Sequence, residues 1–223
     1  MNKSMQLACL GLACLLSFVS SFAHEPKNLS VSKATVVKYH DSGEYQRDQA
    51  RVIDKAMEYL KTRLKKEKAL HSTKKLALVL DIDETALSNY PDMQKMSFGG
   101  TLKQMMDAAA AGKDPAITPV LKLYQYAKEN NVAVFFITGR PEQYRVVTEK
   151  NLMDAGYQNW NGLSFKQENY KETSTAPYKI RARAQIEKQG YDIILNIGDQ
   201  QSDLSGGYAD KTFKLPNPYY LIP

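Results

Sequence analysis

Aspartates follow two apolar runs of the sequence, and their carboxylates have the chemistry to bind a metal ion. Asp81 and Asp83 come directly after the first run, and Asp199 and Asp203 come just after the last. Like charges at close range raise one another's pKa, so four carboxylates gathered at one place favour a bound cation. No histidine or cysteine lies near them, and an all-oxygen ligand set suits a hard ion. We therefore expect Mg²⁺ as the cofactor.

The same region has the residues for phosphoryl transfer. Aspartate is a known covalent nucleophile for phosphoryl groups. Asp83 lies two residues after Asp81 and shares its direction in an extended segment, so one carboxylate can attack while the other handles the proton. A threonine hydroxyl and a lysine ammonium then bind the equatorial oxygens, where charge accumulates. Thr138 supplies the hydroxyl, and Lys179 supplies the ammonium, with Lys171 as a competitor.

The elements that position these residues alternate between strands and helices. Four segments are predicted as buried strands: 76–80, 132–137, 193–197 and, more weakly, 162–165. Three segments between them are predicted as helices: 119–129, 141–155 and 178–189. Apolar runs that are nearly continuous are typical of a parallel sheet covered on both faces, so we predict an α/β, doubly wound fold. Ligands of such sheets bind outside the carboxyl ends of the strands, where the aspartates and the Thr138-Gly139 turn should converge.

Two further segments flank this core. Apolar residues spaced by three and four along 45–66 predict an amphipathic helix with a basic outer face. The insertion at about 88–118 is rich in methionine and alanine, and we predict that it forms a small helical cap over the carboxyl edge of the sheet. Its methionines are expected to fill packing gaps. We expect Arg140 to anchor the loop in which it lies.

The N-terminus is typical of an exported protein. Residues 1–23 combine Lys3, an apolar centre and an exit with small residues, which predicts a signal peptide followed by a domain over 24–223. A membrane anchor and a lipoprotein signal ending at Cys14 are the alternatives. Both cysteines, Cys9 and Cys14, lie inside this segment, so the mature chain has no thiol chemistry and no disulfide. We expect a periplasmic or secreted protein with no stable membrane association after cleavage.

The composition excludes a wholly disordered or fibrous chain. The 223 residues are 43% hydrophobic and 24% charged, which are ordinary globular values. Lys and Arg number 30 against 24 for Asp and Glu, a net charge of +6 that is spread along the chain. The spread favours attraction of small anions over a nucleic-acid partner. The sequence indicates no oligomeric state.

The motifs in order resemble those of the haloacid dehalogenase (HAD) superfamily. They are DIDET at 81–85, ITGRP at 137–141, NLMDAG at 151–156, GDQQSDL at 198–204 and FKLPNP at 213–218. The resemblance is to its secreted acid phosphatases, the bacterial class B and class C enzymes grouped with plant vegetative storage proteins. It covers nearly the whole mature chain and implies a Mg²⁺-dependent phosphomonoesterase that is active at acidic pH.

The resemblance also implies roles for individual residues. Asp81 would become aspartyl-phosphate, and Asp83 would act as the acid and base. The phosphoryl group would be bound by Thr138, Gly139 and Lys179. The metal would be held by Asp81, by the backbone carbonyl of Asp83 and by Asp199, with Asp203 in support. Ile180 stands where serine is common in relatives, which makes Lys179 the assignment that most needs testing.

Other functions of the same fold remain open at this point. A 5′-nucleotidase would require an aromatic clamp for the base in the cap. A phosphotransferase would share the aspartyl intermediate but pass phosphate to an alcohol. A storage or binding protein would keep the fold with little turnover, although the intact Asp81 and Asp83 favour an enzyme.

Overall fold

The structure, a computed structural model, describes residues 25–222. The predicted signal peptide at 1–23, with both cysteines, lies outside the described residues. Within the described range, none of the helices has the length and apolar character needed to cross a bilayer.

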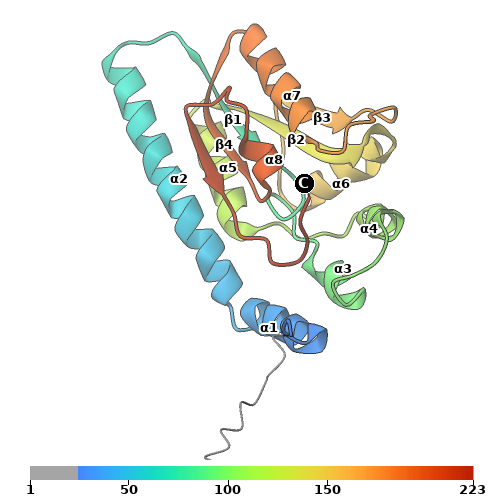
Figure 1. The fold of residues 1–223 in the computed structure, drawn as a ribbon. Coiled ribbons are helices and arrows are strands. Elements are labelled where there is room, and N and C mark those ends of the chain that lie inside the picture. The colour runs from blue at the N-terminus through green and yellow to red at the C-terminus, as the bar shows by residue number, and fades with distance from the viewer. Residues whose placement is uncertain (1–24, 223) are drawn as a thin grey trace, which may run out of the picture.

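Five parallel strands form one sheet in the order β3-β2-β1-β4-β5, which confirms the α/β fold (Figure 1). The strands are β1 (Lys75–Leu80), β2 (Ala133–Pro141), β3 (Gly162–Lys166), β4 (Tyr191–Gly198) and β5 (Lys211–Lys214). At the carboxyl end of central β1, Leu80 pairs with Phe136 of β2 and with Ile197 of β4. Strands β1 and β4 therefore end side by side, while β2 continues past them to Pro141. The residues that follow β1 and β4 meet the last residues of β2 at one edge of the sheet.

Helices cover both faces of this sheet (Figure 1). The helices of the described chain are α1 (Leu29–Asp41), α2 (Glu44–Ala69), α3 (Tyr90–Lys95), α4 (Leu102–Ala109), α5 (Thr118–Glu129), α6 (Arg145–Asp154), α7 (Ala176–Lys188) and α8 (Gln201–Leu204), with a 3₁₀ turn, η1 (Glu142–Tyr144). One face packs against α2 and α5, and the other packs against α7. The sheet is thus doubly wound, as predicted.

Alternation along β1 explains why both faces are covered. Leu78 and Leu80 join the core under α2 and α5, whereas Ala77 and Val79 join the core under α7. Side chains of a strand point alternately to the two faces, so a run that is apolar at every position needs a cover on each side. On the α7 side, Ile186 completes the packing.

The predicted helices are present, with one shifted start. The segments 45–66, 119–129 and 178–189 correspond to α2, α5 and α7. The helix predicted to begin at Pro141 begins instead at Arg145, because β2 continues in an extended conformation to Pro141, which pairs with Lys166 of β3. Gly156 and Gly190 follow α6 and α7 with positive φ, a conformation that costs glycine little.

Strand β5 and helix α1 were not predicted from the sequence. Strand β5 has the sequence KTFK and lies at the exposed edge of the sheet, so it lacks the apolar run that marks the other strands. Helix α1 buries no residue fully, which leaves no amphipathic signal to detect. Its Val36 and Tyr39 are half-buried and pack against the cluster of Tyr45, Tyr90 and Tyr219.

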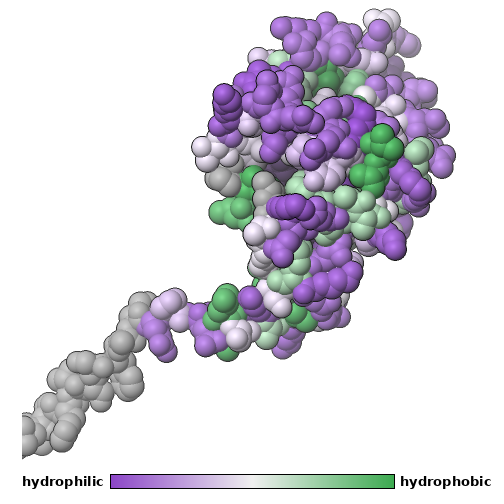
Figure 2. All heavy atoms as spheres, turned by 90° about the vertical axis from the view of Figure 1, so that its right-hand side faces the viewer, coloured by the Kyte–Doolittle hydropathy of each residue, from purple (hydrophilic) through white to green (hydrophobic). Residues whose placement is uncertain are grey.

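The segment predicted as a cap contains the two short helices α3 and α4, which lie beside the carboxyl edge of the sheet (Figure 1). Helix α4 begins with a capping box, in which Thr101 and Gln104 bond each other's backbone N–H groups. Seen from the side of α4 and α6, the surface is mainly hydrophilic, with small separate hydrophobic areas (Figure 2).

Candidate active site

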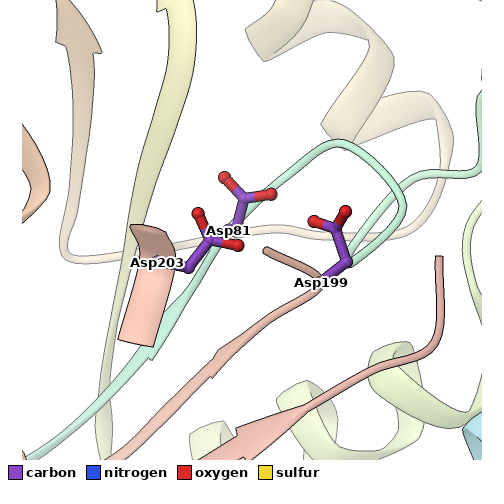
Figure 3. Close-up of side chains that lie close together, drawn as sticks. All are labelled: Asp81, Asp199 and Asp203. Carbon is purple, nitrogen blue, oxygen red and sulfur yellow. The ribbon is translucent and has the colours of Figure 1, made fainter. Parts of the chain in front are cut away.

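Three buried carboxylates face one another at the carboxyl edge of the sheet. Asp81 follows β1, Asp199 follows β4 and Asp203 lies in α8, and their side chains point into the same space (Figure 3). One oxygen of each lies within 4.8 Å of the others. The Asp81 N–H donates to the carbonyl of Ile197 at 3.0 Å, which extends the pairing of β1 and β4 into the site. The predicted convergence of these aspartates is therefore observed.

Lys179 joins two of these carboxylates. From the first turn of α7, its ammonium group donates to Asp81 Oδ1 at 2.6 Å and to Asp203 Oδ1 at 2.5 Å. Burial disfavours the charged form of Lys179, but the two carboxylates hold its pKa above the ordinary value. Lys171, the competitor, is exposed and lies outside this cluster. The geometry thus places Lys179, not Lys171, at the aspartates.

Asp81 remains short of positive charge despite this contact. Burial raises its pKa first, Lys179 lowers it, and the charges of Asp203 and Asp199 raise it again. The net shift of the Asp81 pKa is upward, because burial and the neighbouring carboxylates together outweigh the charge of Lys179. Within the described part of the chain, Oδ2 of Asp81 accepts no hydrogen bond, so this oxygen is available to a substrate.

Asp199 is oriented by three donors. Thr85 Oγ1 donates to its Oδ1 at 3.3 Å, Asn217 Nδ2 donates to its Oδ2 at 2.7 Å, and the Gln200 amide also donates to Oδ2. Burial and the charge of Asp203 raise the pKa of Asp199 to about 6, while these hydrogen bonds oppose the rise. Asn217 lies in the FKLPNP motif, so the sequence contained a signal for it, but its role was not predicted.

Asp203 is fixed by its place at the start of α8. Its Oδ2 accepts the Gln200 N–H at 2.8 Å, which closes a capping box, and its carbonyl accepts from Asn196 at 2.9 Å and from Arg183 at 2.6 Å. Arg183 is buried and also donates to the carbonyls of Ser205 and Gly207. The loop that carries Asp203 is therefore held from both sides.

Asp83, the fourth aspartate predicted at this place, is not one of the three carboxylates that lie together. Arg140 holds it through Nη2 at 2.7 Å and Nε at 3.1 Å, and Asn89 donates to it at 3.1 Å. Burial alone would raise the pKa of Asp83, but the charge and hydrogen bonds of Arg140 hold it below the ordinary value. Arg140 is buried and also donates to Asp114 at 3.1 Å. Arg140 thus anchors the loop, as predicted, and it does so through Asp83.

Thr138 and Gly139, predicted as a turn, belong to the extended carboxyl end of β2. Thr138 is fully buried, and its Oγ1 accepts the Arg140 N–H at 3.1 Å. Gly139 lines the cavity described below, whereas Thr138 does not. The Thr138 hydroxyl, predicted to bind a phosphoryl oxygen, thus contacts the backbone of Arg140, and Gly139 is the residue of the two that reaches the cavity.

Glu84 is a buried acid that sequence reasoning did not single out. Its Oε2 accepts from the Tyr45 hydroxyl at 2.6 Å, and its Oε1 accepts from the Asn89 N–H at 2.5 Å. Burial raises its pKa to about 8. It ties the loop after β1 to α2 and so supports Asp83, its neighbour in the chain.

A cavity of about 430 Å³ opens beside these residues. Asp81, Lys179 and Asp199 line one side of it, and Lys166 and the C-terminal segment 220–222 also contribute. The methionines of α3 and α4 and of the loop between them line it as well. The site therefore consists of a charged part at the strand ends and an apolar part from the predicted cap.

The donor set fits a divalent cation. Three buried carboxylates with one ammonium group carry surplus negative charge, and all candidate ligands are oxygens. A hard ion would offset the repulsion that raises the pKa values of Asp81 and Asp199.

Comparison with known proteins decides the family. The family described as HAD superfamily, subfamily IIIB (Acid phosphatase) matches residues 8–223. The chain belongs to this family. The HAD assignment makes it a phosphomonoester hydrolase and agrees with the resemblance of its motifs.

Named relatives support the same assignment. Acid phosphatase 1 of Solanum lycopersicum is 34% identical over 212 residues, which span 90% of this HAD chain and 81% of that protein. The stem 28 kDa glycoprotein of Glycine max is 40% identical over 152 residues, 65% of this chain and 59% of that protein. Vegetative storage protein 2 of Arabidopsis thaliana is 31% identical over 189 residues, 82% and 68% of the two chains.

A solved structure supports the HAD fold. The class C acid phosphatase from Bacillus anthracis superposes with a TM-score of 0.70 at 20% identity, over 86% of this chain and 85% of that chain.

Proposed function

We propose that this HAD protein is an exported, Mg²⁺-dependent acid phosphatase that hydrolyses phosphomonoesters through an intermediate on Asp81. The observation that carries the proposal is the contact of Lys179 with both Asp81 and Asp203, next to Asp199. This arrangement puts a nucleophile, a cation for the phosphoryl oxygens and a set of metal ligands in one buried pocket.

In the first step, a carboxylate oxygen of Asp81 attacks phosphorus, and the ester P–O bond breaks. The electron pair of that bond goes to the leaving oxygen, which takes a proton from Asp83. Because Arg140 holds the pKa of Asp83 below its ordinary value, this step uses the protonated fraction of Asp83, which grows as the pH falls. Lys179 and the backbone of Gly139 stabilise the charge on the equatorial oxygens. Arg140 keeps Asp83 in a single orientation through its two-point contact, which fixes where the proton is delivered.

In the second step, water attacks phosphorus of the aspartyl-phosphate, and Asp83 accepts its proton. The bond between phosphorus and Asp81 breaks, which releases inorganic phosphate and restores the carboxylate of Asp81. Asp83 thus serves both steps in opposite protonation states, as the acid in the first and as the base in the second.

Asp81, Asp199 and the backbone carbonyl of Asp83 would hold Mg²⁺, and Asp203 would support them. The ion would supply positive charge that lowers the repulsion between the carboxylate of Asp81 and a phosphate dianion.

The matches to vegetative storage proteins raise the alternative of a storage role with little turnover. The pairing of Asp81 with Lys179 and of Asp83 with Arg140 favours an enzyme, because a protein that only stores nitrogen does not need it. The export part of the proposal rests on the sequence of residues 1–23.

The test uses the purified chain and p-nitrophenyl phosphate at acidic pH. We expect hydrolysis that EDTA abolishes and added Mg²⁺ restores, and a loss of at least about 10³-fold in kcat for Asp81→Asn with the circular dichroism spectrum retained. Activity that persists in chelator would contradict the metal-dependent mechanism. Substantial turnover by Asp81→Asn would contradict the nucleophile assignment, and an inactive wild-type protein would favour the storage role.

A further inference from the structure

One side of the active-site cavity is made of methionine. Met93 lies in α3, Met96 follows that helix, and Met105 and Met106 lie in α4. All four line the cavity that also contains Asp81 and Lys179, and we call them the methionine wall. Two alanines of α4, Ala108 and Ala109, continue this apolar surface.

The methionine wall has a firm backing. Met93 is buried among Tyr45, Tyr90 and Tyr219, and Met96 and Met105 are partly buried against the same cluster. Phe98 stacks on Tyr219 with ring centroids 5.7 Å apart. The backing keeps the wall in place, while the unbranched methionine side chains remain adaptable in shape.

The chemistry of the wall selects against polar groups. A methionine side chain has no hydrogen-bond donor and only a weak acceptor, so a hydroxyl buried against it loses its bonds to water without replacement. Among the described side chains of α3 and α4, none that lines the cavity is aromatic, so these helices do not supply the clamp expected of a nucleotidase. The aromatic residue that does line the cavity is Tyr220, which comes from the C-terminal segment. The charged side chains that would bind the phosphoryl group lie elsewhere in the cavity, just after β1 and β4 and in α7 and α8.

We propose that the methionine wall binds the leaving alcohol and that the preferred substrates are monophosphates of apolar, flexible alcohols. This inference rests on the proposed phosphatase function. The phosphoryl group would lie at Asp81 and Lys179, and the alkyl or aryl part would lie against the side chains of α3 and α4.

The test compares ethyl phosphate with n-hexyl phosphate, which have leaving groups of the same chemistry but different apolar length. Each buried methylene is worth about 0.8 kcal/mol, or about fourfold in affinity. With only part of the hexyl group buried, we expect kcat/KM for hexyl phosphate to exceed that for ethyl phosphate by at least about tenfold. The 6-hydroxyhexyl ester, of equal length but with a polar end, should lose much of this advantage.

Variants assign the preference to the wall. Met105→Gln and Met106→Gln should each reduce the hexyl-to-ethyl ratio by about three- to tenfold, because a similar shape is kept while polarity is added. Met105→Leu should retain the ratio, which separates loss of apolar contact from loss of folding. Met153→Gln changes a methionine of α6 that is 48% exposed and outside the cavity, and it should change nothing.

The outcomes distinguish the two proposals. Equal kcat/KM for the hexyl and ethyl esters, or a ratio unchanged in Met105→Gln and Met106→Gln, would overturn the methionine wall as the alcohol site while leaving the phosphatase function intact. Failure of the wild-type protein to hydrolyse any of the esters or p-nitrophenyl phosphate would overturn the proposed function, and this inference with it.

Discussion

A single buried ammonium group, that of Lys179, lies between two aspartates of the candidate site. Asp81 and Asp203 come from different elements, and without Lys179 their charges would face each other in a buried place. Breaking a buried ion pair is costly because it leaves an uncompensated charge. Lys179 therefore holds the two carboxylates in place, and under the proposed function it would also offer positive charge to a phosphoryl group.

Alanine substitutions of Lys179 and Lys171 test the proposed role of the Lys179 ammonium group. We expect Lys179→Ala to lower kcat by about 10²- to 10³-fold, as when a single group that stabilises transition-state charge is removed. Lys171→Ala is the matched control, because this lysine is exposed, and it should retain activity within about twofold. Steady-state kinetics with p-nitrophenyl phosphate give the comparison, and thermal melts show whether each variant folds. A larger effect at Lys171 than at Lys179 would contradict the assignment.

Residue identities were predictable from sequence, but side-chain partners were not. The motifs at the ends of the strands and at the start of α7 indicated the residues that meet at the site, which are Asp81, Asp199, Asp203 and Lys179. The pairing of Asp83 with Arg140 joins residues 57 positions apart and depends on how far β2 extends before α6 begins. Glu84 gave no signal, since burial of an acid beside a tyrosine of α2 is a tertiary property.

At the scale of elements, β4 and α8 approach so closely that one position excludes a side chain. A Cβ added to Gly198, the last residue of β4, would overlap the Cβ and the carboxylate of Asp203. The glycine of the GDQQSDL motif is thus explained by the position of its second aspartate. The turn that follows also positions Asp199, so the positions of Gly198, Asp199 and Asp203 depend on one another.

The substitution Gly198→Ala tests this unit. The added methyl group should displace Asp203 from Lys179, and a shift of about 1 Å at a catalytic group can cost on the order of 10²-fold in rate. Crowding should also lower the free energy of unfolding by about 1–3 kcal/mol. Gly99→Ala is the control, because a Cβ there meets nothing nearer than 3.6 Å. Kinetics and urea unfolding of both variants give the comparison, and wild-type activity of Gly198→Ala would show that the loop yields without consequence.

Apolar patterning predicted the central elements and failed at the edges of the fold. Strands β1, β2 and β4 are buried on both faces along their central positions, and most residues at these positions are therefore hydrophobic. Strand β5 pairs with β4 through its backbone and leaves its side chains largely exposed, and α1 packs only part of one face. Pairing that depends on the backbone leaves no trace in residue type, so such elements are found only in the structure.

At the scale of the whole molecule, buried acids connect stability to pH. Glu84 has no cationic partner among the described residues, and burial raises its pKa to about 8, compared with 4.5 when it is exposed to water. Between these values the folded protein keeps a proton that the unfolded chain releases. Stability must therefore fall as pH rises through this window, which favours the folded state in acid.

The substitution Glu84→Gln tests this dependence of the free energy of unfolding on pH. One proton bound more by the folded state lowers the free energy of unfolding by about 1.4 kcal/mol for each pH unit. Urea unfolding is measured at pH 5, 6 and 7, in chelator so that no metal charge contributes. The free energy of unfolding of Glu84→Gln should fall less steeply with pH than that of the wild type, by about this amount for each pH unit. Glu84→Gln should also be the more stable of the two proteins at pH 7. Glu168→Gln, at an exposed glutamate, is the control and should keep the slope. Identical slopes in wild type and Glu84→Gln would mean that Glu84 is ionised in the folded protein and that its acid form does not hold α2 to the loop after β1.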